Sequence, residues 1–442
     1  MRHQWGRALS AAAYVMRSVL TANTEAEHYT VSCSSRLGGS KKAHREEREA
    51  VVCFVGRGIR GRRRHTRQTE TSKRTSKEVL VMFLKQVAVY SGVFSAVLLV
   101  TFAVPGLWAL VKFCGVVCFL CMLSRRATTE VYTLLGRKPV SAKNKAVLIT
   151  GCDTGFGHEL VKRLDQRGFT VYAGCLFPDG DGAQKLRETC SENVTVLPLD
   201  VTKDKQVEDA VRAVKDSLGG KDLWAIVANA GVIYAAEMEW GKLDLLYKTF
   251  EVNVFGVVRS VKAFLPLIRK ARGRVIVSTS LWSHYSVPFA VGYCMSKCSA
   301  RFFVDGLRKE MKKFGVKVVS IEPNMYATNL TADNILVPTM EKQFADTPEE
   351  VRKEYGDAYL KKCQECLLKG LNDSRPNISE VIDSFEESVT ASVPKYAYHP
   401  DGVVRSLLWR LVYIAPPPMQ DFIFNSFSQP REFLANRNIC RG

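Results

Sequence analysis

The sequence lacks the cysteine and histidine spacing of a structural metal site. Its 13 cysteines are an odd number, and they do not follow the pattern of a small disulfide-bonded domain, so we expect mostly reduced thiols. Cys363 and Cys366 form a CxxC pair, but neither a second pair nor a histidine pair lies at zinc spacing. Because the surrounding stretch is rich in Lys, Glu and Leu, we expect an ordinary helix there and predict no metal ion.

The chain also lacks positive charge where a globular domain would need it to bind nucleic acid. The formal net charge is +19, but residues 1–79 hold 17 Lys/Arg against 7 Asp/Glu, and residues 80–145 hold 8 against 1. That leaves +2 for residues 146–442. Because phosphate binding requires clustered Lys and Arg on the folded surface, this distribution argues against nucleic acid as a partner.

The first part of the chain has too few apolar residues to build a core. The stretch 57–77 contains almost none, which predicts a disordered basic leader over 1–79. The first 24 residues include three arginines and no acid, a composition typical of a mitochondrial presequence. A tail without function and a translation start at Met82 are the two other interpretations.

Residues 87–123 are almost wholly apolar, with Lys112 as the one charge. Because about 20 such residues cross a bilayer, this stretch is a candidate membrane anchor. One interpretation is a single helix over 90–111. The other is a hairpin of two helices, over 87–104 and 107–123, that turns at a Pro-Gly pair. Lys and Arg flank both ends, and the hairpin would place both flanks on the cytoplasmic side, so we favour it.

From Lys145 onward, short apolar strands alternate with segments of helical periodicity. This alternation predicts an α/β fold, a doubly wound parallel sheet of the Rossmann type with helices on both faces. The strands that we expect are 146–150, 170–175, 194–199, 223–228, 274–279 and 316–322, and the helices are 157–167, 203–218, 242–271 and 291–313.

A glycine-rich loop, TGCDTGFG at 150–157, follows the first of these strands. Glycines permit a tight turn and let the backbone approach a pyrophosphate, whose charge the following helix N-terminus stabilises. The second strand ends at 173–176 with no acid for the ribose of NAD and no base for the 2′-phosphate of NADP. The missing base favours NAD over NADP.

Tyr293 and Lys297 form a YxxxK pair on an expected helix. Their spacing puts both side chains on one face, where an ammonium would lower the phenol pKa from about 10 and create a general base. Alone, the pair would indicate two surface residues. Ser280, at the end of a strand 13 residues earlier, and Asn253 precede it in the chain. Together these four residues predict a catalytic group.

Taken in order, these motifs resemble the short-chain dehydrogenase/reductase family over about residues 144–440. The resemblance is to its membrane-associated branch, with 17-beta-hydroxysteroid dehydrogenase type 2, the retinol dehydrogenases and D-beta-hydroxybutyrate dehydrogenase. The glycine-rich loop matches TGxxxGxG, and ANAG at 228–231 matches NNAG. The turn 199–201 matches the one that contacts adenine, and 394–424 resembles the C-terminal region of the branch.

One departure from the family falls after the sixth strand, where its Pro-Gly is Pro323-Asn324 here. Because Asn tolerates positive φ better than most residues, we expect the turn to persist.

The resemblance implies a catalytic tetrad of Asn253, Ser280, Tyr293 and Lys297. Tyr293, as phenolate, would take the hydroxyl proton while hydride passes to the nicotinamide, and Ser280 would bind the substrate oxygen. Lys297 would lower the Tyr293 pKa and bind the ribose, and Asn253 would hold a water of the proton relay. The residues implied in cofactor binding are Thr150, Gly151, Gly155, Phe156, Gly157, Cys175, Asp200, Val201, Asn229, Ala230, Gly231, Tyr293, Lys297, Pro323 and Thr328.

The expected substrate is a bulky apolar alcohol, such as a steroid or a retinoid. Aromatic and apolar side chains gather in two loops, at Trp282, Tyr285, Val287 and Phe289 and at Met325 and Tyr326. A short hydroxy acid would need a cation for its carboxylate, and the first loop offers only His284. D-3-hydroxybutyrate is the alternative substrate, and a non-catalytic cofactor-binding scaffold is the alternative of another class.

We therefore expect an NAD-dependent alcohol dehydrogenase anchored in the endoplasmic reticulum membrane, with its catalytic domain in the cytosol. The mitochondrial inner membrane is the alternative location, and the resemblance also implies a homo-oligomer. The C-terminal extension would lie on the membrane or cover the substrate site. The expected divisions are a leader at 1–79, transmembrane segments at 80–126, a linker at 127–143, the catalytic domain at 144–395 and the extension at 396–442.

Overall fold

The computed structural model describes three long stretches of the chain and scattered positions near them. The predicted leader lies outside the described residues, as do most of the apolar segment before residue 106 and most of the extension after residue 401. The chain divides into two compact units, one of residues 1–128 with 434–442 and one of residues 129–433. The described stretches are 106–135, 139–331 and 333–401, with positions within 91–99 and 409–420.

The helix α3 (Leu107–Leu135) is 29 residues long and presents apolar side chains to its surroundings. Phe113, Phe119 and Leu120 have exposed fractions of 65%, 60% and 53%. Within the part of the chain that the structure describes, no helix combines the length and the apolar character needed to cross a bilayer. The predicted transmembrane segments are therefore not confirmed.

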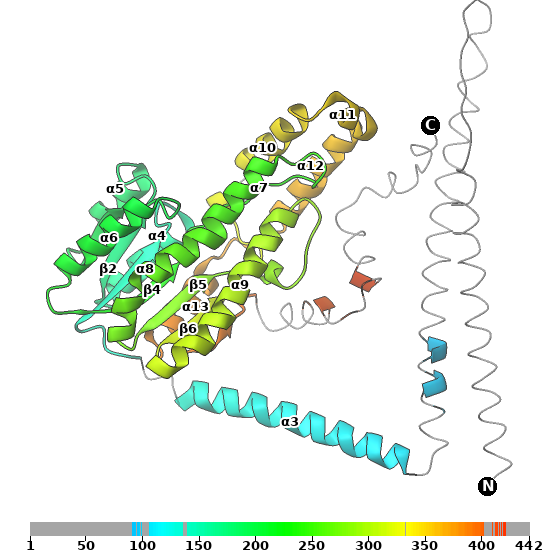
Figure 1. The fold of residues 1–442 in the computed structure, drawn as a ribbon, viewed down its shortest axis with the longest axis horizontal. Helices are drawn as coiled ribbons and strands as arrows, with labels where there is room; N and C mark the ends of the chain where they lie inside the picture. Colours follow the sequence, from blue (N-terminus) through cyan, green and yellow to red (C-terminus); the bar gives the residue numbers. More distant parts are fainter. Residues whose placement is uncertain are drawn as a thin grey trace, which may run out of the picture. The chain divides into compact units, whose positions relative to one another are not determined.

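A parallel sheet of seven strands forms the centre of the second unit (Figure 1). The chain enters at β1, builds outward to β3, returns to β4 beside β1, and then builds outward on the other side, giving the order β3-β2-β1-β4-β5-β6-β7. This confirms the predicted Rossmann-type sheet, with β7 as an unpredicted addition. The strands are β1 (Lys145–Thr150), β2 (Thr170–Cys175), β3 (Val194–Pro198), β4 (Asp222–Ala228), β5 (Arg274–Ser278), β6 (Lys317–Ile321) and β7 (Ala397–Tyr398).

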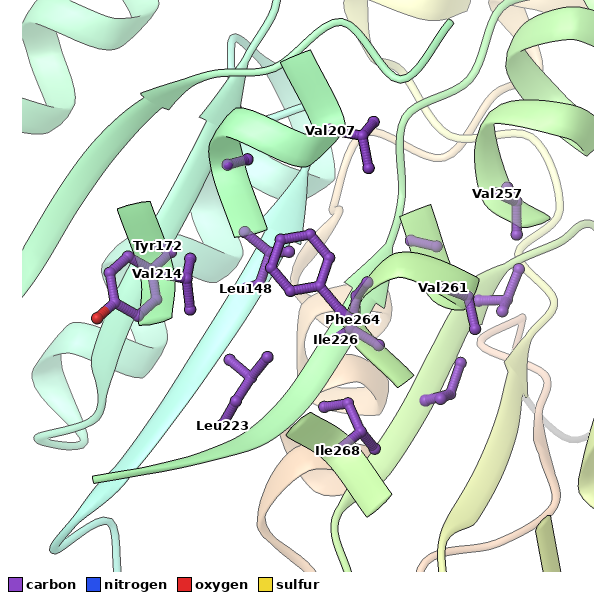
Figure 2. Packing of buried hydrophobic residues seen from close by; sticks show 14 of the residues in the cluster. Leu148, Tyr172, Val207, Val214, Leu223, Ile226, Val257, Val261, Phe264 and Ile268 are labelled. Carbon is purple, nitrogen blue, oxygen red and sulfur yellow. The ribbon is translucent and has the colours of Figure 1, made fainter. Parts of the chain in front are cut away.

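Helices cover both faces of the sheet. One face packs against α6 (Asp204–Ser217), α8 (Val257–Lys270) and α9 (Val291–Met311), and the other against α4 (Gly155–Gln166), α5 (Asp181–Thr189) and α13 (Ser379–Thr390). Figure 2 shows Leu148 and Ile226 of the sheet among Val214 of α6 and Phe264 of α8. Because both faces of the inner strands are buried, these strands are nearly continuous apolar runs, which is why the sequence revealed them.

Three further helices form a small packed group of their own, which we call the lid helices. Figure 1 shows them grouped at one end of the sheet. Their apolar cluster joins Met340, Phe344 and Cys363 to Trp240 and Phe289. Of the three, only the helix around the CxxC pair is predicted from the sequence. The lid helices are α10 (Asp333–Ala345), α11 (Glu349–Tyr355) and α12 (Asp357–Asn372).

The single helix predicted over 242–271 is wrong, because the chain forms three successive elements there. They are α7 (Leu243–Phe250), a π-helical turn η1 (Glu251–Gly256) and α8. A Cβ at Gly256 would lie 2.6 Å from the Val201 side chain, so glycine allows this turn to approach the loop that follows β3. Single π turns inside helices often occur at functional sites.

Candidate active site

The glycine-rich loop is shaped by two residues in the left-handed backbone region. Gly151 and Gly155 have φ of 71° and 65°, values that favour glycine. A Cβ at Gly151 would lie 2.8 Å from the Cα of Ala230, so the loop needs glycine to reach the ANAG segment. Thr150 Oγ1 accepts hydrogen bonds from the backbone N–H groups of Asn229 and Ala230, at 3.1 and 3.0 Å. The glycine-rich loop and the ANAG segment therefore contact each other directly.

A cleft of about 1690 Å³ runs over the loops that follow the strands. Among the predicted cofactor-binding residues, Thr150, Gly157 and Cys175 do not line it, and Cys175 is fully buried. The N-terminus of α4 opens into the cleft at Gly155, where the nearest atom to an added Cβ would be 3.8 Å away on Thr328. Such an open helix N-terminus fits a pyrophosphate. The predicted residues that do line the cleft are Gly151, Gly155, Phe156, Asp200, Val201, Asn229, Ala230, Gly231, Tyr293, Lys297, Pro323 and Thr328.

The buried Asn253 lies in the π-helical turn and joins two parts of the site. Its Nδ2 donates to the Val232 carbonyl at 2.9 Å and to Ser296 Oγ at 3.0 Å, and its Oδ1 accepts from the Val232 N–H at 2.8 Å. A Cβ on Gly231 would lie 3.3 Å from Asn253 Oδ1 and 3.4 Å from Lys297 Nζ. Both polar side chains therefore face the same glycine.

The structure brings Ser280, Tyr293 and Lys297 together at the end of β5. Ser280 hydrogen-bonds the Tyr293 phenol, and its hydroxyl accepts from the Trp282 N–H at 3.1 Å. Lys297 is buried one turn further along α9. Its Nζ donates to the Ser278 carbonyl at 2.8 Å and lies 5.7 Å from the centre of the Tyr293 ring.

The electrostatics of this group differ from the prediction. Burial raises the pKa of Tyr293 above its ordinary value, and the hydrogen bond with Ser280 offsets only part of that rise. Burial also lowers the pKa of Lys297 to about 8. The predicted lowering of the Tyr293 pKa is wrong for this structure, because desolvation of the phenol dominates. The phenol is therefore protonated at neutral pH and must lose its proton before it can act as a base.

Apolar and aromatic side chains form much of the lining in the rest of the cleft. Trp282, Val287, Phe289, Met325 and Tyr326 line it, as predicted from the sequence, and the lid helices add Leu336 and Leu367. The predicted Tyr285 does not line the cleft but stacks on the lining residue Trp409, with ring centroids 5.4 Å apart. The C-terminal extension thus supplies part of the wall.

Cations are scarce in this lining. Among the described residues that line the cleft, only Lys248 and Lys297 carry a positive charge. Lys248 lies one turn before Glu251, which Arg259 links to the Val201 carbonyl at the end of β3. His284 does not line the cleft. Its Nε2 instead donates to the buried Glu322 carboxylate at 2.7 Å.

One residue that sequence reasoning missed is Asp153, in the glycine-rich loop. Its carboxylate accepts hydrogen bonds from the backbone N–H groups of Leu176 and Phe177, at 3.0 and 2.8 Å. All three residues line the cleft. A carboxylate therefore lies beside the end of β2 although the strand itself ends without an acid, and a search confined to β2 could not find it.

The two cysteines of the CxxC pair lie in different surroundings on α12. Cys363 is fully buried in the lid cluster, and burial raises the pKa of its thiol to about 12. Cys366 lies at the cleft wall, and burial raises its pKa also. In the described parts of the chain, no group of His, Cys, Asp and Glu is arranged to hold a metal ion.

Fold and site together define a class, an NAD(P)-dependent oxidoreductase built on a Rossmann-type sheet. A family model described as short chain dehydrogenase matches residues 145–336. The chain is 36% identical over 291 residues to estradiol 17-beta-dehydrogenase 2 of Mus musculus. The aligned region covers 65% of this chain and 76% of that protein. It belongs to the short-chain dehydrogenase/reductase family.

Two further relatives have different names. The chain is 36% identical over 290 residues to the mitochondrial D-beta-hydroxybutyrate dehydrogenase of Mus musculus, covering 64% of this chain and 84% of that one. It is 35% identical over 318 residues to human 17-beta-hydroxysteroid dehydrogenase type 2, covering 71% and 79%. A short-chain dehydrogenase structure from Streptomyces avermitilis has the same fold, with a TM-score of 0.51, 19% identity and coverage of 64% of this chain and 97% of that one.

Proposed function

We propose that this protein oxidises a hydroxyl group on a bulky apolar substrate, a steroid or a retinoid, with NAD as the hydride acceptor. The observation that carries the proposal is the part of the cleft lined by apolar side chains such as Trp282, Phe289 and Leu367, which we call the substrate half. Among all the described lining residues of the cleft, only Lys248 and Lys297 are cations. Burying apolar surface contributes about 25 cal/mol per Å², so such a wall selects an apolar molecule. The names of two relatives, an estradiol and a hydroxysteroid dehydrogenase, support the steroid class.

The chemistry follows from the residues at the end of β5. When bound, the nicotinamide supplies the acceptor for hydride. The Tyr293 phenolate takes the proton of the substrate hydroxyl, and Ser280 donates a hydrogen bond to the same oxygen as its charge changes. Lys297 would hold positive charge beside the ribose and the phenolate, and Asn253 would hold a water of the proton relay.

The preference for NAD is supported by Asp153. In this type of fold the adenosine ribose lies at the end of the second strand. The Asp153 carboxylate is fixed there by two backbone N–H groups, and it would repel the 2′-phosphate of NADP. The ribose hydroxyls of NAD are hydrogen-bond donors that a carboxylate can accept.

Hydroxybutyrate is a second candidate because of the relative that bears its name. Its carboxylate would need a cation in the substrate half of the cleft. NAD reduction by the purified protein with a steroid, a retinoid and D-3-hydroxybutyrate separates the candidates. A protein that turns over none of them but binds NADH would instead support the non-catalytic scaffold.

We also propose that residues 80–126 attach the protein to the endoplasmic reticulum membrane, with the catalytic unit in the cytosol. We further propose that the protein forms a homo-oligomer. The support for the attachment is the exposed apolar surface of α3. Alkaline carbonate extraction of cell membranes tests attachment, and imaging of the tagged full-length chain decides between this membrane and the mitochondrial inner membrane. Recovery in the soluble fraction would overturn the attachment.

A further inference from the structure

A short C-terminal segment, residues 397–401, crosses the edge of the sheet beside the active site, and we call it the strap. Its first two residues are β7, which pairs in parallel with β6. The backbone N–H of Glu322 donates to the Tyr398 carbonyl at 2.8 Å. The strap therefore reaches the end of β6 at the point where the chain turns into the cleft.

The turn that follows β6, residues 323–326, lies between the strap and the reacting group. Pro323, Asn324, Met325 and Tyr326 all line the cleft. The Pro323 carbonyl accepts from the Leu281 N–H at 3.0 Å and from Ser280 Oγ at 3.4 Å. A displacement of this turn would therefore move the groups around Ser280.

The next two strap residues hold both ends of the turn. His399 Nδ1 donates to the Glu322 carboxylate at 3.1 Å, and Glu322 is 3% exposed. At the other end, the Tyr326 hydroxyl donates to the Pro400 carbonyl.

The last strap residue, Asp401, holds the middle of the turn. Asn324 Nδ2 donates to its carboxylate at 2.8 Å, and Asp401 is 3% exposed. Arg375 Nη1, 3.5 Å from the same carboxylate, offsets its charge. Among the described residues Asn324 is not one of those with positive φ, so this position does not require glycine. The expectation that Asn324 is tolerated here because it adopts a positive φ is therefore wrong. Its side-chain amide instead donates to the Asp401 carboxylate.

We infer that the strap is a positioning element for the cofactor side of the cleft, and that Asp401 acts through Asn324 to fix the turn. A buried carboxylate that pairs with one amide of the turn holds it more rigidly than glycine would. The inference rests on the proposed cofactor but not on the identity of the substrate.

The test is NADH binding to the purified full-length protein, followed by the fluorescence of NADH, with thermal unfolding measured on the same samples. We expect Asp401→Ala and Asn324→Ala each to weaken NADH binding at least about 10-fold, which is about 1.4 kcal/mol. Because the two substitutions remove the same interaction, their effects should not add. The double variant should bind NADH no more than about 3-fold more weakly than the single variant that has the lower affinity. Asp401→Asn keeps an acceptor for the Asn324 amide and should recover part of the loss.

The matched control is Asp383→Asn, which removes an exposed carboxylate that pairs with Arg163 on α4. It should bind NADH within about 2-fold of the wild type. If Asp401→Ala does not fold, Asn324→Ala and Asp401→Asn carry the test. Affinity within about 2-fold of the wild type in Asn324→Ala, or losses that multiply in the double variant, would overturn the positioning role. A wild-type protein that does not bind NADH would overturn the proposed function as well.

Discussion

Tyr293 is the residue on which the proposed chemistry depends. Its phenol hydrogen-bonds Ser280 and lies beside the buried Lys297. Tyr293→Phe removes the proton acceptor but keeps the ring, so we expect the oxidation rate to fall by about 10²–10⁴ while NADH affinity stays within a few-fold. Steady-state kinetics and NADH binding on the same preparation check this. Retention of most of the activity would assign the proton transfer to another group.

The pH dependence should reflect the raised pKa of Tyr293. Oxidation needs the phenolate, so kcat/KM for the alcohol should rise with pH from neutral into the alkaline range. Reduction of the carbonyl product needs the phenol, which is the form present at neutral pH. The rate of reduction should therefore not rise with pH over this range. Rates in both directions across this range test the assignment, and alcohol oxidation that is fastest below pH 7 would contradict it.

Asp153 is the residue on which the cofactor preference depends. Asp153→Ser removes the carboxylate beside the ribose position, so we expect the ratio of kcat/KM for NAD to that for NADP to fall at least about 10-fold. Asp179→Ser is the control, because Asp179 is in the loop after β2 but does not line the cleft. An equal ratio in the variant and the wild type would remove Asp153 from this role.

At the scale of elements, the ion cluster around Glu322 joins three segments of the chain. Burial alone would raise the pKa of Glu322, but hydrogen bonds from His284 and His399 outweigh it and lower the pKa to about 2. The ionised carboxylate therefore stabilises the fold above its ordinary pKa of 4.5, and this stability is lost as pH falls toward 2.

Glu322→Gln imitates the protonated form of this carboxyl. We expect it to lower the free energy of unfolding by about 3 kcal/mol at pH 7, and we expect the difference from the wild type to shrink below about pH 4. Chemical denaturation at several pH values measures both quantities. A difference that stays constant between pH 7 and pH 3.5 would show that the cluster does not act through its charge.

Elements differ in how far the sequence could predict them. The inner strands β1, β2, β4, β5 and β6 were predictable because buried parallel strands are nearly continuous apolar runs. Strand β3 is partly exposed and was recognised by its Val and Leu residues. The π-helical turn was not, since residues 251–256 continue the helical pattern on both sides. Strand β7 has only two residues, too few for any periodicity.

From the residues alone, the site was most readily predicted where its chemistry is local in sequence, and the family resemblance added Asn253 and Ser280. Tyr293 and Lys297 are four residues apart on one helix, and the glycine-rich loop is continuous. By contrast, Asn324 and Asp401 are 77 residues apart, and Asp153 meets its partners 23 and 24 residues later. Those contacts exist only after the sheet has formed. The burial that raises the pKa of Tyr293 is likewise a property of the folded site.

At the scale of the whole molecule, the cleft assembles from parts far apart in the chain. The sheet supplies the cofactor side, the lid helices supply apolar side chains, and Trp409 comes from the C-terminal extension. The apolar side chains in this lining favour a large apolar alcohol over a small acid.

The most direct test is NAD reduction by the detergent-purified full-length protein with estradiol, retinol and D-3-hydroxybutyrate in parallel, with Tyr293→Phe as the blank. We expect turnover of the steroid or the retinoid, with kcat/KM for hydroxybutyrate lower by at least about 100-fold, a difference near 2.7 kcal/mol. Turnover of hydroxybutyrate alone would contradict the apolar substrate and would support the mitochondrial alternative.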